Sequence, residues 1–159
     1  MFGMINVIHI KKIAVFLPGL FAAVLCMAQV NQVGKIVSYK KITGGIEGRG
    51  NGYIFDVHAY SDHIFQVRIS KNTTFTNLPY ALESTVIPSF QAKVKDSGKT
   101  IEISTAAVTA VIEKEPALKI TFRNSTGEII NQDATDYSYG ASFLGDRVSL
   151  YKKLQDGER

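Results

Sequence analysis

The sequence predicts an all-β protein built as an antiparallel β-sandwich, and three observations support this fold class. Apolar and polar residues alternate with period two along several segments, as a strand with one buried face requires. Turn signals made of Gly, Pro, Asn, Asp and Ser interrupt these segments about every ten residues. No helical period of convincing length occurs between residues 29 and 159. Short strands separated by such turns are typical of an antiparallel sandwich or barrel.

The first 28 residues have the pattern of a secretory signal peptide. Lys11 and Lys12 precede an apolar run from Ile13 to Met27, and Ala28 offers a small residue for cleavage. The run is shorter than the roughly 20 residues that cross a bilayer, which argues against a retained membrane anchor. We therefore expect a signal peptide at 1–28, one sandwich domain at 29–159, and export to the periplasm or the medium.

Composition after cleavage argues against several functional classes. Cys26 is the only cysteine and leaves with the signal, so we expect no disulfide. Removal of Lys11 and Lys12 lowers the formal charge from +4 to +2, and the remaining charges are scattered. We therefore expect no nucleic-acid surface. The glycine-rich stretch 44–52 lacks the G-x-x-x-x-G-K-[ST] pattern of a phosphate-binding loop, and we expect no cofactor.

The first half of the domain is predicted to contain three strands. The first covers residues 35–42, and the glycine-rich stretch 44–52 is expected to be a loop that crosses between sheets. A hairpin follows, with strands at 53–60 and 65–70 joined by a turn at Ser61-Asp62. Alternation in the first of these strands assigns Tyr53, Phe55 and Val57 to the core and His58 to the solvent face.

The second half is predicted to contain further short strands. Residues 72–89 are rich in turn signals. Pro79 and Pro88 exclude a central strand at their positions. Extended structure resumes at 91–95, and Asp96-Ser97-Gly98 forms a turn. The alternation changes phase near 105–107, which indicates a bulge or a break between two strands. The last predicted elements are a strand at 118–123, a turn at 124–127 and a strand at 128–130.

Two segments carry a resemblance to a known family. Residues 55–71, FDVHAYSDHIFQVRISK, resemble the opening hairpin of the N-terminal β-sandwich of glycoside hydrolase family 31, the α-glucosidase and α-xylosidase family. The block from 100 to 130 is similar to the later hairpins of that domain. The residues that match the later pattern are Ile101, Ile103, Thr105, Val111, Lys114, Pro116, Ile120, Phe122 and Gly127. The resemblance implies a galactose-mutarotase-like sandwich.

The C-terminal segment 147–159, RVSLYKKLQDGER, resembles the strand with which this family leaves the sandwich. In the family that strand runs into an aromatic-rich Gly-Leu-Gly-Glu motif, which opens the catalytic region. Here only Gly157, Glu158 and Arg159 follow. We therefore expect a fragment that is truncated before the catalytic barrel; an ordinary disordered tail is the alternative.

The resemblance implies a parent enzyme that hydrolyses α-linked glycosides by a retaining mechanism. Its two catalytic aspartates lie on a (β/α)8 barrel, which needs a few hundred residues and has no room in this chain. We therefore expect no catalytic residue, and a domain that packs on the barrel of the same parent and shapes its carbohydrate pocket. Tyr151 and Leu154 are expected in the apolar patch that the barrel covers.

Two other functions stay open on the sequence alone. A free-standing secreted carbohydrate-binding module requires an exposed aromatic row, for which Tyr53, Phe55 and Phe65 are the candidates, although they fit the core face better. A structural or adhesive sandwich requires no sugar site.

Candidate binding residues gather in the segment NQDATDYSYG. Carboxylates bind hydroxyl groups and aromatic faces stack on pyranose rings, so this segment is a weak candidate for a sugar site. The candidate residues are Asp133, Asp136, Tyr137 and Tyr139. The alternative is a polar loop with two half-buried tyrosines. Asp56 and His58 share a strand face, but no third ligand has suitable spacing, and we expect no metal site.

Overall fold

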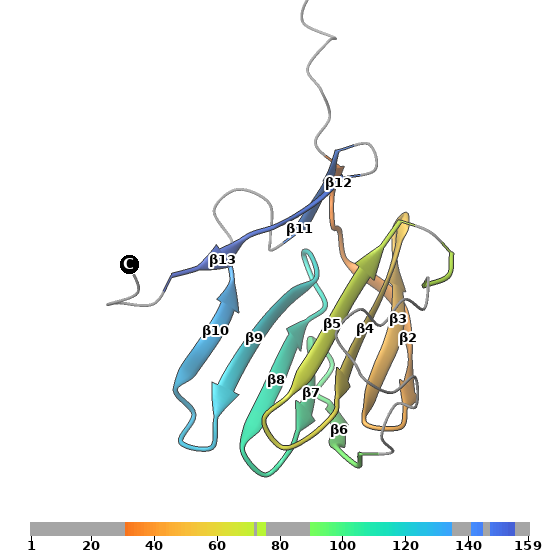
Figure 1. Ribbon diagram of the computed structural model, residues 1–159. Helices are drawn as coiled ribbons and strands as arrows, with labels where there is room; N and C mark the ends of the chain where they lie inside the picture. The colour runs from red at the N-terminus through yellow and green to blue at the C-terminus, as the bar shows by residue number, and fades with distance from the viewer. Residues whose placement is uncertain (1–30, 72, 76–89, 135–140, 145–146, 155–159) are drawn as a thin grey trace, which may run out of the picture. The chain divides into compact units, whose positions relative to one another are not determined.

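The computed structural model describes residues 31–71, 73–75, 90–134, 141–144 and 147–154. Every regular element in these ranges is a β-strand, and the strands form three antiparallel sheets (Figure 1). The predicted all-β sandwich is confirmed. The predicted signal peptide at 1–28 lies outside the described residues, and the domain boundary at 28–29 stays a prediction.

The first sheet is a four-stranded meander in the order β2-β3-β4-β5. Consecutive strands pair in antiparallel register, so each connection is a hairpin. Its strands are β2 (Ile36–Ile42), β3 (Gly45–Gly50), β4 (Tyr53–Ala59) and β5 (Phe65–Ser70). β2 and β5 are therefore the two edges of this sheet.

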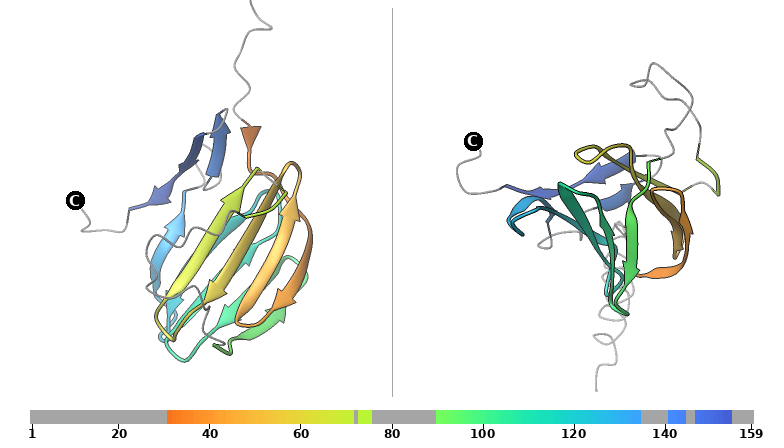
Figure 2. Two further views of the ribbon diagram at one scale, coloured as in Figure 1. Left: turned by 45° about the vertical axis from the view of Figure 1, so that its right-hand side comes forward. Right: turned by 90° about the horizontal axis from the view of Figure 1, so that it is seen from below.

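The second sheet has six strands in the order β13-β10-β9-β8-β7-β6. Its strands are β6 (Lys93–Asp96), β7 (Thr100–Ser104), β8 (Val108–Glu113), β9 (Lys119–Asn124), β10 (Ile129–Asp133) and β13 (Lys152–Lys153). A third sheet joins β1 (Asn31–Gln32), β11 (Ala141–Leu144) and β12 (Arg147–Leu150) in the order β1-β11-β12. Only Tyr151 separates β12 from β13, so one C-terminal stretch connects this sheet to the edge of the six-stranded one (Figure 2).

The hydrophobic core lies between the sheets. All three sheets contribute buried side chains to one cluster. Its members are Val33, Ile46, Tyr53, Phe55, Val57, Ile101, Ile103, Ala110, Ile112, Leu118, Ile120, Ala141 and Phe143. Each large side chain among them stabilises the fold by roughly 1.5–3 kcal/mol through removal from water. The core assignment of Tyr53 and Phe55 is confirmed, which removes two of the three aromatics that an exposed binding row would need.

The glycine-rich stretch 44–52 is not a loop, and this prediction was wrong. β3 runs through it, with Gly48 opposite Phe55 and Gly50 opposite Tyr53 in the register of β4. A Cβ on Gly48 would lie 2.5 Å from the ring of Phe55, and one on Gly50 would lie 1.8 Å from the ring of Tyr53. The glycines are therefore required because two aromatic rings of the neighbouring strand occupy the space of their side chains.

The solvent-face prediction for His58 was also wrong, because β4 is buried on both faces. Ile54, Asp56 and His58 point away from the core and are 8%, 3% and 5% exposed. The ring of His58 lies edge-on to that of Tyr60, with centroids 4.8 Å apart. β4 is an inner strand, and on its outer face Arg68 of β5 pairs with Asp56.

The predicted turns at 96–98 and 124–127 are confirmed, whereas the turn-rich segment predicted at 72–89 lies almost entirely outside the described residues. Gly98 and Gly127 have φ values of +83° and +88°, a region that glycine adopts without steric cost. The phase change near 105–107 is a break, since the β7–β8 hairpin turns there. The Thr105 hydroxyl accepts hydrogen bonds from the backbone N–H groups of Ala107 and Val108, at 3.3 and 3.0 Å, and stabilises this turn.

Candidate functional site

Asp133 is the one predicted binding residue that lies within the described ranges. It is the last residue of β10 and is 7% exposed. Its Oδ2 accepts a hydrogen bond from the Ile120 backbone N–H at 2.8 Å, and its Oδ1 forms an ion pair with Lys152. Asp133 therefore connects β10 to β9 and to β13. Asp136, Tyr137 and Tyr139 lie outside the described residues, so the proposed sugar site stays a prediction.

Asp133 borders a groove of about 520 Å³ at one side of the sandwich. β5, the edge of the four-stranded sheet, forms one wall, and β9, β10, β12 and β13 form the other. The lining residues are Val67, Arg68, Ile69, Ser70, Phe75, Ile120, Asp133, Val148, Leu150 and Lys152. We call this groove the mouth of the sandwich, since its apolar floor continues into the core through Ile120, which is 1% exposed.

The mouth leaves apolar side chains in contact with water. Val67, Val148 and Leu150 are 36%, 44% and 62% exposed. Val67 belongs to the core face of β5, because it lies opposite the fully buried Val57 in the register of β4 and β5. A core-facing side chain that remains exposed on an edge strand indicates a surface that another element covers.

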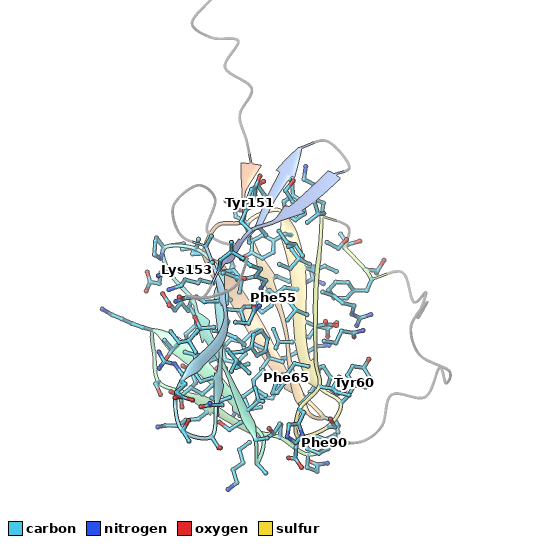
Figure 3. The ribbon with its side chains drawn as sticks, turned by 60° about the vertical axis from the view of Figure 1, so that its left-hand side comes forward. Phe55, Tyr60, Phe65, Phe90, Tyr151 and Lys153 are labelled. Atoms are coloured by element: carbon cyan, nitrogen blue, oxygen red, sulfur yellow. The ribbon has the colours of Figure 1, made fainter. Side chains whose placement is uncertain are left out.

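The C-terminal stretch extends this apolar surface. Tyr151 is 40% exposed and Leu154 is 71% exposed, and both follow directly after the mouth residue Leu150. Figure 3 shows Tyr151 and Lys153 on this stretch and Phe55 and Phe65 inside the sandwich. Both residues expected in an apolar patch are exposed. Val67, Val148 and Leu150 were not predicted, because sequence alternation does not tell an edge strand from an inner strand.

The charged groups at the mouth are engaged in ion pairs within the domain. Lys152 pairs with Asp133, and Arg68 pairs with Asp56 from the neighbouring strand. The hydrogen bond to Asp56 raises the pKa of the Arg68 guanidinium above its ordinary value, so Arg68 stays charged. These pairs satisfy charges at the rim of an apolar surface and form no acid–base arrangement for catalysis.

The described ranges contain no three His, Cys, Asp or Glu side chains placed to hold a metal ion together. Within the same ranges, no helix is long and apolar enough to span a membrane. The structure therefore offers the mouth as its main candidate site, and the mouth has the character of a packing surface.

No protein-family model matches the sequence, and no curated protein matches it. Solved structures do match the fold. A family 31 dextranase from Flavobacterium johnsoniae, solved with isomaltotriose, superposes with a TM-score of 0.70 at 14% identity over 80% of this chain. A family 31 α-xylosidase from a soil metagenome, solved with xylose, has a TM-score of 0.54 at 15% identity over 69% of this chain. The cycloalternan-forming enzyme of Listeria monocytogenes gives 0.56 at 12% identity over 72%.

In each case this chain covers only a small part of the other protein: 16% of the dextranase, 16% of the α-xylosidase and 10% of the cycloalternan-forming enzyme. Identities this low establish a shared fold and leave activity undetermined. The resemblance predicted from the two sequence segments is thereby confirmed at the level of the fold: the chain has the β-sandwich fold of one segment of glycoside hydrolase family 31 enzymes.

Proposed function

We propose that this chain is the non-catalytic N-terminal β-sandwich domain of a secreted α-glycoside hydrolase of family 31. The observation that carries the proposal is the shared fold with a segment that makes up 16% of two family 31 enzymes. The domain packs on the catalytic barrel of the same parent and helps shape the entrance of its carbohydrate pocket. Alone it has no glycosidase activity, because the two catalytic carboxylates belong to the barrel.

The mouth supports this role as the surface that packs on the barrel. It combines exposed apolar side chains from β5 and β12 with the exposed Tyr151 and Leu154 that follow. Apolar surface at an edge strand is a hazard for association when it stays uncovered. A covalently linked barrel would bury this surface in every molecule, since both domains belong to one chain.

The parent enzyme is proposed to act on α-linked glucosides or xylosides. The dextranase was solved with isomaltotriose and the α-xylosidase with xylose, and both belong to the family that the fold indicates. Export follows from the predicted signal peptide. The rival proposal is a free-standing secreted carbohydrate-binding or structural module, which would leave the mouth permanently in water.

The deciding experiment compares this chain alone with the same chain followed by a family 31 catalytic barrel in one polypeptide. We expect the fused form to be more soluble and to melt at a higher temperature, and only the fused form to hydrolyse aryl α-glucosides or α-xylosides. A matched fusion carries Leu150→Ser, which should lose part of the gain in melting temperature. A chain that is monomeric and cooperatively folded at high concentration by itself, and gains nothing from the barrel, would favour the free-standing module.

A further inference from the structure

The mouth follows the backbone of β5, an edge strand of the four-stranded sheet. Its lining includes four consecutive residues of β5, from Val67 to Ser70, whereas β12 contributes the alternate residues Val148 and Leu150. Consecutive residues of a strand point to opposite faces of its sheet, and alternate residues point to the same face. The mouth is therefore bordered by the backbone edge of β5 on one side and by a face of β12 on the other.

Two hydrogen bonds at the end of β4 show which of its backbone groups point towards β5. The Ala59 N–H donates to the Gly44 carbonyl oxygen at 2.9 Å, so the odd-numbered residues of β4 bond towards β3. The Tyr60 N–H donates to the Ile64 carbonyl oxygen at 2.8 Å, so the even-numbered residues bond towards β5. This alternation is the rule in antiparallel ladders, where hydrogen-bonded and non-hydrogen-bonded pairs follow one another.

Val67 and Ile69 direct their backbone groups into the mouth. They lie opposite the odd-numbered Val57 and Phe55, in non-hydrogen-bonded pairs, so their N–H and C=O groups point away from β4. Among the described residues, no strand pairs with β5 on that side. The mouth therefore presents backbone donors and acceptors together with the apolar side chains at its walls.

The opposite edge of the same sheet is protected against pairing. The register between β2 and β3 shifts next to Ile36, and the Ile36 N–H donates to the Lys114 carbonyl oxygen at 3.0 Å. Such irregularities and covering contacts keep an edge from accepting another strand. β5 instead keeps an unbroken register with β4 from Phe65 to Ser70, and Val67 at its middle is apolar and 36% exposed. Of the two edges, β5 is the one suited to accept a strand.

We propose that the mouth takes an added β-strand, which pairs with the outer edge of β5 and continues the four-stranded sheet. The strand is an extended segment of the parent polypeptide outside the sandwich, so this inference rests on the proposed function. Backbone hydrogen bonds to Val67 and Ile69 hold the segment, as in peptides that extend a sheet at its edge. At roughly 3.3 Å per residue, the stretch from Val67 to Ser70 offers about 13 Å of edge, enough for about four residues.

The walls of the mouth define the chemistry of the added strand. Its side chains opposite Val67 and Ile69 are apolar, because they pack between β5 and the exposed Val148 and Leu150 of β12. The side chains between them point to the other face and are polar. A partner that offered only side chains would cover the apolar walls and leave the backbone groups of β5 buried without partners, which is unfavourable. A strand satisfies both requirements.

The test is hydrogen–deuterium exchange of single backbone amides, measured by mass spectrometry with fragmentation. It compares the isolated chain with the chain fused to a family 31 catalytic barrel. We expect the Val67 and Ile69 amides to exchange fast in the isolated chain and at least about tenfold more slowly in the fused form. The Gln66 and Arg68 amides should be protected in both forms, because they bond towards β4.

A proline variant tests the backbone pairing directly. Val67→Pro removes an N–H that points into the mouth and leaves the ladder to β4 complete. In the fused form it should reduce the gain in melting temperature and the protection of Ile69. Lys41→Pro is the matched control, since Lys41 lies opposite Ile46 on β2 and its N–H points away from β3. Each variant is compared with its own isolated chain, and the control should keep the full gain.

The outcomes separate this inference from the proposed function. Fast exchange of Val67 and Ile69 in a fused form that still gains melting temperature would overturn the added strand and leave the packing on the barrel intact. Protection of both amides in the isolated chain that rises with protein concentration would assign the edge to a second copy and overturn the proposal. Slow exchange in the fused form without a gain in melting temperature would support the added strand and contradict the proposed stabilisation by the barrel.

Discussion

The two sides of the sandwich, where the edges of its sheets come together, are closed in different ways. On the β2–β6 side, polar groups join the sheets: the Tyr39 hydroxyl donates to Asp96, and the Lys41 ammonium donates to the Val94 carbonyl oxygen at 3.1 Å. Lys114 donates to both oxygens of the same Asp96, at 2.8 and 2.9 Å. On the β5 side, the mouth leaves Val67, Val148 and Leu150 in water.

This difference separates an edge that polar groups close from an edge that leaves apolar side chains exposed. Charged and polar side chains at an edge protect it against pairing with another chain, whereas apolar side chains at an edge invite contact. Val57 and Val67 lie opposite each other on neighbouring strands, yet Val57 is fully buried and Val67 is 36% exposed. Val57 lies on an inner strand, whereas Val67 lies on the edge strand β5.

The largest expected effect compares two phenylalanines on the core face. Phe55 on β4 is fully buried, whereas Phe65 on β5 is partly buried and packs edge-to-face on Phe122 with centroids 5.5 Å apart. Phe55→Ala should lower the free energy of unfolding by about 3–5 kcal/mol, because it leaves a closed cavity. Phe65→Ala should cost clearly less, since part of its ring already contacts water. Urea unfolding followed by circular dichroism measures both, and equal losses would contradict the difference between β4 and β5.

The next largest expected effect concerns the glycines of β3. Gly50→Ala should lower the free energy of unfolding by about 1–3 kcal/mol, because its Cβ would lie 1.8 Å from the Tyr53 ring and force that ring to move. Gly34→Ala is the matched control, since a Cβ there meets nothing within 4 Å. We expect the control to change stability by less than about 0.5 kcal/mol. Thermal melts of the two variants check this prediction; a harmless Gly50→Ala would mean that β3 tolerates side chains.

The pH dependence of stability tests the polar contacts that join β2 to β6. Hydrogen bonds from Lys114, Tyr39 and the Gly98 backbone lower the pKa of Asp96 to about 2. Because the pKa is lower in the folded than in the unfolded state, the contribution of Asp96 is fully present above pH 4. It is lost as the pH falls from about 4 to about 2. Asp96→Asn should therefore flatten the acid limb of stability in that window. Melting temperatures at pH 2 to 7 measure this change in stability. An unchanged acid limb would show that Asp96 contributes nothing to the contact between β2 and β6.

The smallest expected effect on stability concerns the C-terminal stretch. Tyr151→Gln together with Leu154→Gln should change the free energy of unfolding by less than about 1 kcal/mol, because both side chains are largely exposed. Association should decrease strongly, since the variant removes apolar surface beside the mouth. Light scattering after size-exclusion chromatography measures the oligomeric state. A comparable pair of changes on β2, Tyr39→Gln with Ile42→Gln, should instead destabilise the fold.

Several elements were predictable because their signals are local. The β4–β5 hairpin follows from strict alternation around Ser61-Asp62, and the turns at Gly98 and Gly127 follow from residues that favour them. β3 was missed because glycine is a turn signal in isolation, and only the rings of Tyr53 and Phe55 explain why it occurs in a strand. The buried outer face of β4 was missed because alternation alone predicts one wet face.

The candidate site also combines features that the sequence predicted with features that it did not. The exposure of Tyr151 and Leu154 was expected from the family resemblance, whereas the mouth required knowledge of which strand is the edge. The predicted binding residue Asp133 is the end of a strand, where its carboxylate connects β9, β10 and β13. A row of charged side chains crosses the four-stranded sheet through Lys40, Glu47, Asp56 and Arg68. Its ends lie 28 positions apart in the sequence, and no local pattern brings them together.

By itself, the sequence determined the all-β class, most strands of the sandwich and the resemblance to one enzyme family, because periodicity and turn chemistry act over a few residues. The tertiary structure decided which strands are edges, which glycines replace side chains, and which charges meet across the sheet. These properties depend on pairing between segments far apart in the chain, and packing between the sheets sets that pairing.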